Sequence, residues 1–137
     1  MSFLNMEQSP RLSVVVLPFR TLGNKSNEGD IAEALTNDLT TELARIPGVL
    51  VIARASTATY KEGTIDYRRI GQELGVRYAV EGTVRKPDGD TFRISVQLIA
   101  TTNSKQIWAD RFDETSKGVA VAHDAIVRRI RDRKRHV

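Results

Sequence analysis

The chain has 137 residues, of which 40% are hydrophobic and 28% charged, and it contains no cysteine. This length suits one domain with a single hydrophobic core, and the composition excludes a wholly disordered chain. The lack of cysteine excludes disulfides, thiolate metal sites and cysteine nucleophiles. The sequence contains no run of 18 apolar residues, so it predicts no membrane span.

The formal net charge of +4 is concentrated at the C-terminal end. Residues 128–136 hold six of the 21 basic residues and one of the 17 acidic residues, which leaves 15 basic and 16 acidic residues elsewhere. The sequence therefore predicts a near-neutral body, with a charge of −1, and a basic tail.

The first half of the chain predicts a strand, a helix and a second strand. Residues 11–19 are apolar on both faces around Val14–Leu17, as in a strand buried within a sheet. Asp30 with Glu33 resembles a capping box, and apolar residues then recur at helical spacing up to Pro47-Gly48. A second β-branched strand is expected at 49–53. The two strands are expected to be parallel, because a right-handed helical crossover joins them.

A short helix is expected next, between Asp66 as its N-cap and Gly75 as its C-terminal stop. Its apolar side chains, Tyr67, Ile70 and Leu74, recur at helical spacing and are expected to face inward.

Three alternating runs follow, at 78–85, 91–100 and 106–112. Pro87-Asp88-Gly89 and Asn103 supply turn residues between them, so the runs predict an antiparallel meander. A last helix is expected at 119–136, with one apolar side formed by Val119, Ala122, Ile126 and Ile130.

The expected architecture is α/β: a single mixed sheet of about five strands, in the order strand, helix, strand, helix, three strands, helix. The N-terminal part is a parallel crossover and the C-terminal part an antiparallel meander. The expected divisions are a flexible lead-in at 1–10, one domain at 11–130 and the basic tail at 131–137.

Catalytic and metal-binding patterns are weak. Residues 23–29 lie where phosphate-binding loops occur, but they lack the G-x-x-x-x-G-K-[ST] pattern and carry an acid at Glu28. Ser56, His123 and Asp113 form a conceivable triad without a nucleophile elbow, and the second histidine, His136, lies in the tail. We expect no catalytic residue, cofactor or metal.

Several polar or aromatic side chains on the meander have both structural and functional interpretations. Glu81 is expected to form a structural ion pair with Arg93, and Asp110 one with an arginine. The single tryptophan, Trp108, is expected to pack in the core rather than to anchor a partner.

Several segments, taken together and in order, resemble the TolB amino-terminal-like, or FlgO-like, domain of bacterial proteins. The segments are VVVLPF (14–19), EALTNDLTTELARIPGVLVIARAST (33–57), YKEG (60–63), ELGVRYAVEGTVRK (73–86), RISVQLIATTNSKQIWADRFD (93–113) and HDAIVRRI (123–130). The resemblance implies a compact α/β domain of bacterial origin without known catalytic residues, used in assembly and signalling. Relatives often carry an adenylate cyclase label because of a neighbouring domain, and no cyclase motif is recognisable in this chain.

We therefore expect a non-catalytic interaction or regulatory domain of a bacterial signalling protein. The candidate site joins a loop after the second strand to the first helix, because ligands bind at the carboxyl ends of parallel strands. Its residues are Arg54, Ser56, Thr57, Tyr60 and Asp38. A purely structural role for Arg54 and Tyr60 fits equally well.

Two alternatives stay open. The same loop is a candidate sensor of a small ligand such as a nucleotide. The basic tail is a candidate for weak nucleic-acid binding through Arg128, Arg129, Arg131, Arg133, Lys134 and Arg135, which the near-neutral body disfavours. The expected partner is a protein, a neighbouring domain or a second copy. Because neither a signal peptide nor a span is visible, a cytoplasmic location is expected.

Overall fold

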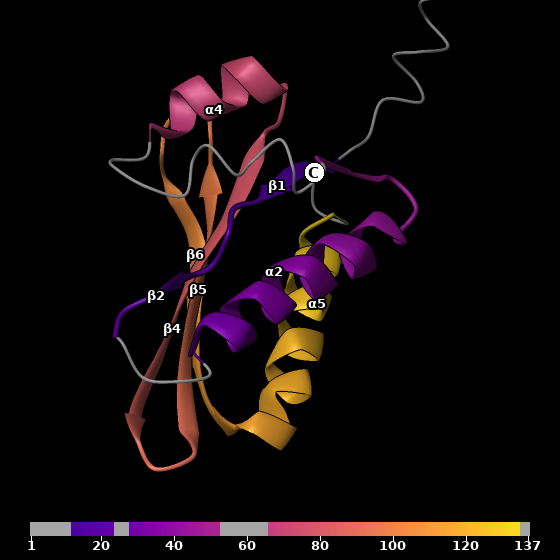
Figure 1. The fold of residues 1–137 in the computed structure, drawn as a ribbon. Helices are drawn as coiled ribbons and strands as arrows, with labels where there is room; N and C mark the ends of the chain where they lie inside the picture. Colours follow the sequence, from indigo (N-terminus) through magenta and orange to yellow (C-terminus); the bar gives the residue numbers. More distant parts are fainter. Residues whose placement is uncertain (1–11, 24–27, 53–65, 135–137) are drawn as a thin grey trace, which may run out of the picture.

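The structure is a computed structural model that describes residues 12–23, 28–52 and 66–134 (Figure 1). These residues form an open mixed sheet with helices packed on it, so the predicted α/β architecture is confirmed. In chain order the elements are β1 (Leu12–Val16), β2 (Arg20–Thr21), α2 (Glu28–Ala44), β3 (Val49–Ile52), α4 (Tyr67–Leu74), β4 (Tyr78–Asp88), β5 (Thr91–Ala100), β6 (Gln106–Thr115), the 3-10 turn η2 (Ser116–Gly118) and α5 (Val119–Lys134).

The sheet has six strands in the order β3-β1-β4-β5-β6, with β2 paired to β4. β1 is parallel to both β3 and β4, whereas β4, β5 and β6 are antiparallel, so the predicted parallel pair and meander are both confirmed. The two-residue strand β2, which no sequence pattern predicted, follows β1 along the same edge of β4.

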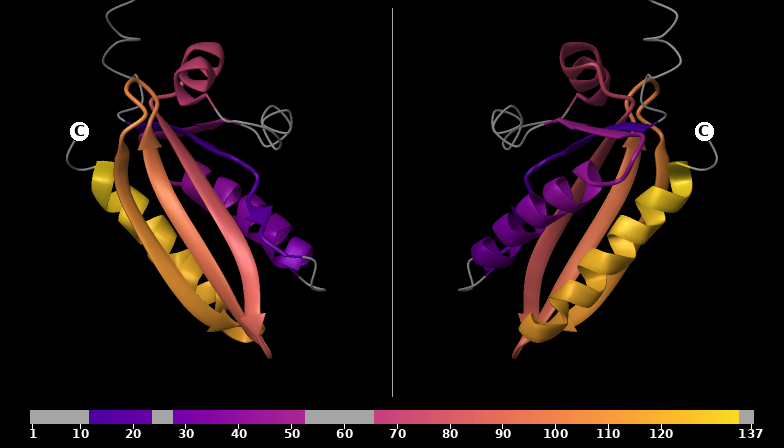
Figure 2. Two further views of the ribbon diagram at one scale, coloured as in Figure 1. Left: turned by 90° about the vertical axis from the view of Figure 1, so that its left-hand side faces the viewer. Right: turned by 90° about the vertical axis from the view of Figure 1, so that its right-hand side faces the viewer.

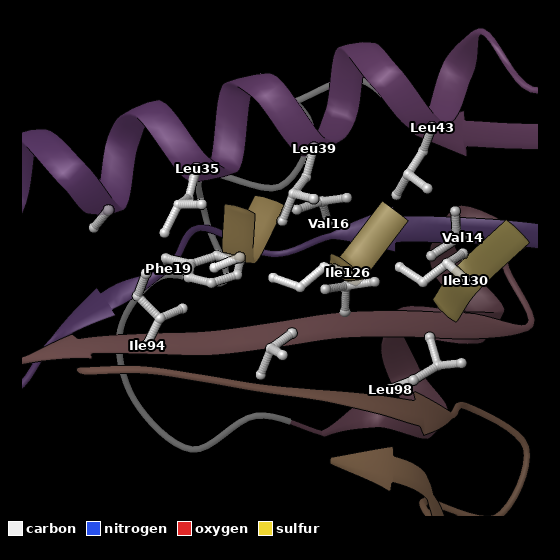
Figure 3. Packing of buried hydrophobic residues seen from close by; sticks show 14 of the residues in the cluster. Val14, Val16, Phe19, Leu35, Leu39, Leu43, Ile94, Leu98, Ile126 and Ile130 are labelled. Atoms are coloured by element: carbon white, nitrogen blue, oxygen red, sulfur yellow. The ribbon is translucent and has the colours of Figure 1, made fainter. Parts of the chain in front are cut away.

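The two long helices α2 and α5 cover one face of the sheet (Figure 2). Their buried residues, Ala32, Leu35, Leu39 and Leu43 of α2 and Ala122, Ile126 and Ile130 of α5, recur every three or four positions as predicted. They pack against alternate residues of the strands, including Val14, Ile94 and Leu98 (Figure 3). This cluster is the main core. Each fully buried aliphatic side chain contributes about 1.5–3 kcal/mol.

The opposite face is covered at one end by the short helix α4 (Figures 1 and 2). Val15, Leu17, Ile70, Val76 and Ala79 form a second, smaller cluster beneath it. The predicted caps are confirmed: the Asp66 carboxylate accepts a hydrogen bond from the Arg69 amide at 3.3 Å, and Gly75 has a φ of 69°.

The helix α2 begins at Glu28, so the prediction that Asp30 caps it is wrong and Asp30 lies in the first turn. The Glu28 side chain is buried, and one carboxylate oxygen accepts a hydrogen bond from the amide of Lys86 at 2.8 Å. This contact with β4 fixes the first turn two residues before Asp30.

The strand β6 carries a register irregularity opposite Leu98 and Ile99. Trp108 packs against the main core as predicted, together with Phe112, and the irregularity brings Ile107 against the core as well. Trp108 is half-buried, and the guanidinium of Arg129 lies 5.0 Å from its ring centroid.

Candidate functional site

The face of β4, β5 and β6 that α2 and α5 leave uncovered carries a groove of about 540 Å³. This uncovered face is seen in the left view of Figure 2. The groove, called here the open-face groove, is lined by Arg20, Glu81, Gly82, Thr83, Ser95, Val96, Gln97, Gln106, Ala109, Asp110 and Arg111.

Strand pairing brings polar side chains from four strands into one row across this groove. Arg20 of β2 pairs with Thr83 of β4, which pairs with Ser95 of β5, which pairs with Arg111 of β6. Alternate residues of a strand point to opposite faces, so the neighbours of these residues belong to the core. The row, called here the central row, places small hydroxyl residues between two arginines.

A buried glutamate organises one wall of the groove. One oxygen of Glu81 accepts hydrogen bonds from the Tyr67 hydroxyl at 2.5 Å and from the Gln97 amide at 2.6 Å. The other oxygen binds the guanidinium of Arg20 at 2.7 Å. Gln97 in turn accepts a hydrogen bond from Gln106 at 2.5 Å. These five residues form the Glu81 network, which joins α4 to four strands.

The Glu81 network places Tyr67 in a setting that keeps its phenol neutral. Burial raises the pKa of Tyr67 above its ordinary range, and the hydrogen bond to Glu81 and the negative charge of that carboxylate raise it further. The phenol is therefore a fixed hydrogen-bond donor. The Glu81 side chain is only 8% exposed, and both of its oxygens are hydrogen-bonded.

A group of arginines lies beside the central row, nearer the β4–β5 turn. Arg85 stands directly opposite Arg93, and Arg93 binds Asp113 of β6 at 2.9 Å. The hydrogen bond from Arg93 lowers the pKa of Asp113, as do the charges of Arg93, Arg111 and Arg85. Within the described residues, neither Arg85 nor Arg111 forms an ion pair, so this arginine cluster has more positive than negative charge.

Most residues of the sequence-predicted site fall outside the described residues. This applies to Arg54, Ser56, Thr57 and Tyr60. Asp38 is described and exposed on α2, the helix that covers the other face of the sheet, so the structure does not bring Asp38 to the open-face groove.

The basic residues near the C-terminal end point in different directions. Arg129 stacks on Trp108 and lies 3.5 Å from Asp110, which confirms the expected pairing of Asp110 with an arginine. Arg128 and Arg131 line a separate groove of about 360 Å³ with Glu42, His123, Asp124 and Val127. For Arg133 and Lys134 only the backbone is described, as part of α5, and Arg135 lies outside the described residues.

Other chemistry expected from the sequence is placed as follows. Glu81 binds Arg20 and Arg93 binds Asp113, so the predicted Glu81–Arg93 pair is wrong. His123 lies 3.2 Å from Asp124, whereas Ser56 and residues 24–27 of the phosphate-loop candidate lie outside the described residues. In the described ranges, no cluster of three or more potential metal ligands occurs.

Sequence reasoning missed Arg20, Tyr67, Gln97 and Gln106 as site residues. The polar positions of the meander were recognised, and they are the signal that points to this face. What was missing was the register that sets Gln97 opposite Glu81, and the strand β2 that brings Arg20 to them.

The fold of the described residues is similar to that of several solved bacterial protein domains. The lipoprotein GNA1162 of Neisseria meningitidis superposes with a TM-score of 0.61 at 18% identity, covering 87% of this chain and 96% of that one. The C-terminal domain of LpoB from Escherichia coli gives 0.59 at 14% identity, covering 85% and 96%. TolB of Acinetobacter baumannii gives 0.58 at 17% identity, covering 88% of this chain and 27% of TolB. At these identities the likeness concerns the fold alone.

The model of the HilA/YgeH-like transcriptional regulator second domain matches residues 10–132, and this chain belongs to that family. A curated relative, the putative adenylate cyclase 3 of Rhizobium meliloti (strain 1021), is 37% identical over 118 residues. The match covers 86% of this chain and 20% of the relative, so the chain spans about a fifth of that protein's length. None of the helices in the described part of the chain is both long and apolar enough to cross a membrane.

Proposed function

We propose that this chain is a non-catalytic regulatory domain that binds another protein, or a neighbouring domain of a longer protein, through the open-face groove. The observation that carries the proposal is the Glu81 network. It is a hydrogen-bonded arrangement around the buried Glu81, on a sheet face that the described residues leave uncovered beyond α4. Such a network fixes the positions of exposed polar groups, as a recognition surface requires.

The titratable groups of this face are poorly suited to proton transfer near neutral pH. The raised pKa of Tyr67 keeps the phenol protonated, and Arg93 keeps the Asp113 carboxylate ionised by lowering its pKa. Both oxygens of Glu81 already accept hydrogen bonds. Because a general acid or base works best with a pKa near the operating pH, this arrangement favours binding over catalysis.

The family supports a regulatory role. The matched family is the second domain of transcriptional regulators, whereas the curated relative is named a putative adenylate cyclase and is about five times longer than the matched region. A domain found in proteins with different named outputs suits a module that transmits a signal to other domains. We extend this to the assembly and signalling role implied by the resemblance to FlgO-like domains.

Site-specific photo-crosslinking in cells that make the full-length protein tests this proposal. A photoreactive residue is placed at Ala109, an exposed residue of the groove wall, and in a control at Asn37, an exposed residue of α2. We expect a discrete crosslinked product at Ala109, either to one protein or within the same chain, and none at Asn37. No crosslink at Ala109, or the same products at both positions, would refute the groove as the binding surface.

A second candidate function is the sensing of a small ligand, which the groove volume of about 540 Å³ favours. Sites for small molecules enclose about 300–1,000 Å³. Thermal unfolding of residues 1–137 with ATP, GTP, cyclic AMP and cyclic di-GMP tests it. A ligand present at 100 times its Kd adds about 2.7 kcal/mol of stability. If none of the four nucleotides raises the unfolding temperature, they are excluded as ligands.

We also propose weak nucleic-acid binding through the basic tail and a cytoplasmic location. Weak nucleic-acid binding through the basic tail predicts salt-sensitive binding that disappears when residues 128–137 are deleted. A cytoplasmic location predicts that the tagged full-length protein appears in the cytoplasmic fraction of the cells that make it.

A further inference from the structure

We infer that the open-face groove binds an acidic peptide segment, with a carboxylate of that segment held over the central row between Arg20 and Arg111. This inference rests on the proposed function and specifies the chemistry of the partner. It is carried by the charge and the shape of the groove.

The central row has short side chains in its middle and long side chains at its two ends. Thr83 and Ser95 are small, and they lie on the two middle strands between the two arginines. Neighbouring strands of a sheet lie about 4.8 Å apart. A carboxylate above the two hydroxyls would therefore be about equally far from the backbones of Arg20 and Arg111. Hydroxyl groups and guanidinium groups are the donors that a carboxylate accepts from.

Both arginines have donors left for a ligand. Arg20 uses one terminal nitrogen for Glu81, and its side chain is 39% exposed, so other N–H groups of the guanidinium remain available. Arg111 is exposed and has no ion pair among the described residues. The Glu81 network holds Arg20 in place, so a ligand would not have to order that side chain on binding.

The surroundings add positive charge. Arg85 and Arg93 stand directly opposite each other, an arrangement that is destabilising unless a negative charge lies between them. Asp113 supplies one such charge for Arg85, Arg93 and Arg111 together. A second carboxylate from a partner complements the remaining positive charge.

The lining favours a peptide over a nucleic acid. Among the described residues, this lining contains no aromatic side chain on which a base would stack. Gln97, Gln106, Thr83 and Ser95 supply donors and acceptors of the kind that bind a peptide backbone.

Fluorescence anisotropy with the 137-residue chain tests the inference. The probe is a fluorescein-labelled 12-residue peptide of glycine and serine with four glutamates, and its matched control carries glutamine at those four positions. We expect the glutamate peptide to bind at least about tenfold tighter, as expected for hydrogen bonds between ionised groups. We expect Arg111→Gln to weaken this binding about tenfold, the effect of losing one such contact.

The control variant is Arg45→Gln, which removes one positive charge from the exposed turn that follows α2, the helix on the other side of the sheet. It should bind the glutamate peptide as the unchanged chain does. Because Arg111 is exposed and has no ion pair with a described residue, its replacement should leave the thermal unfolding temperature unchanged. Weaker binding by Arg111→Gln would then show that a contact with the peptide is lost, rather than that the fold is disturbed.

Equal binding of the two peptides, or equal weakening by Arg111→Gln and Arg45→Gln, would overturn the inference. If a single-stranded oligonucleotide binds more tightly than the glutamate peptide, and Arg111→Gln weakens that binding, the ligand of the groove is nucleic acid and the acidic-peptide inference is wrong. If the peptide fails but the photoreactive residue at Ala109 still gives its product, the interaction function stands and only the acidic ligand is wrong.

Discussion

The two faces of the meander differ in how their side chains are held. On β5, Phe92, Ile94, Val96 and Leu98 face the helices and are nearly inaccessible, whereas Arg93, Ser95 and Gln97 alternate with them on the open face. The covered face is held by burial, which has no directional requirement. The open face is held by hydrogen bonds and ion pairs at specific positions. Stability therefore resides mainly in the first face, and the second can be specialised for recognition at little cost to the fold.

The largest expected effect comes from the covered face. Ile126 of α5 is fully buried in the main core, so Ile126→Ala should lower the free energy of unfolding by about 2–5 kcal/mol. Ser95→Ala, on the floor of the open-face groove, should change it by less than about 0.5 kcal/mol. Urea denaturation of both variants measures the difference, and similar losses would show that the open face contributes to stability as much as the core.

Gly82 sharpens the comparison at the level of one strand. A β-carbon at this position would lie 2.3 Å from a ring carbon of Phe19 in the core. Gly82→Ala should therefore destabilise the fold by about 1–3 kcal/mol through overpacking. Its neighbour Thr83 points to the groove, and Thr83→Ala should have a much smaller effect on the urea midpoint. A Gly82→Ala variant as stable as the unchanged chain would mean that Phe19 moves aside freely.

The elements of the covered face could be predicted from the sequence because their patterns are local. The spacing of Ala122, Ile126 and Ile130 and the alternation of Phe92 through Leu98 each require only neighbouring residues. The start of α2 could not be predicted in this way. Its first turn is fixed by Glu28 binding an amide 58 residues away, at Lys86. The strand β2 has only two residues and forms through its pairing with β4.

The open-face site was harder to predict because it depends on register. The sequence predicts a structural ion pair for Glu81, but with Arg93 as its partner. Pairing of β4 with β5 sets Arg93 opposite Arg85 and Gln97 opposite Glu81, and the counter-ion Arg20 comes from β2. The predicted loop site at Arg54, Ser56, Thr57 and Tyr60 stays a prediction.

Within the open face, the charge of the buried Glu81 should contribute more to the free energy of unfolding than the exposed pair of Arg93 and Asp113. Glu81→Gln leaves one acceptor oxygen for three donors and places an amide group against Arg20, so it should cost about 1–2 kcal/mol. This is below the full range for a buried charge because the Arg20 side chain is 39% exposed. Asp113→Asn, which breaks the exposed pair with Arg93, should cost less in the same urea experiment. The reverse order would place the energetic centre of this face at the arginine cluster.

The smallest effect at neutral pH is expected for Tyr67→Phe, because Glu81 keeps its bonds to Gln97 and Arg20. At alkaline pH this variant should separate from the unchanged chain. The pKa of Tyr67 is raised on folding, so the folded state retains the phenolic proton while the unfolded state loses it near pH 10. The stability contributed by Tyr67 is therefore complete below about pH 10 and declines as the pH rises above it. The thermal unfolding temperature of the unchanged chain should fall more steeply with pH than that of Tyr67→Phe between about pH 9 and pH 11.5. Tyr78→Phe is the control, because Tyr78 lies outside the Glu81 network. Parallel profiles for the unchanged chain and Tyr67→Phe would mean that folding does not raise the pKa of Tyr67.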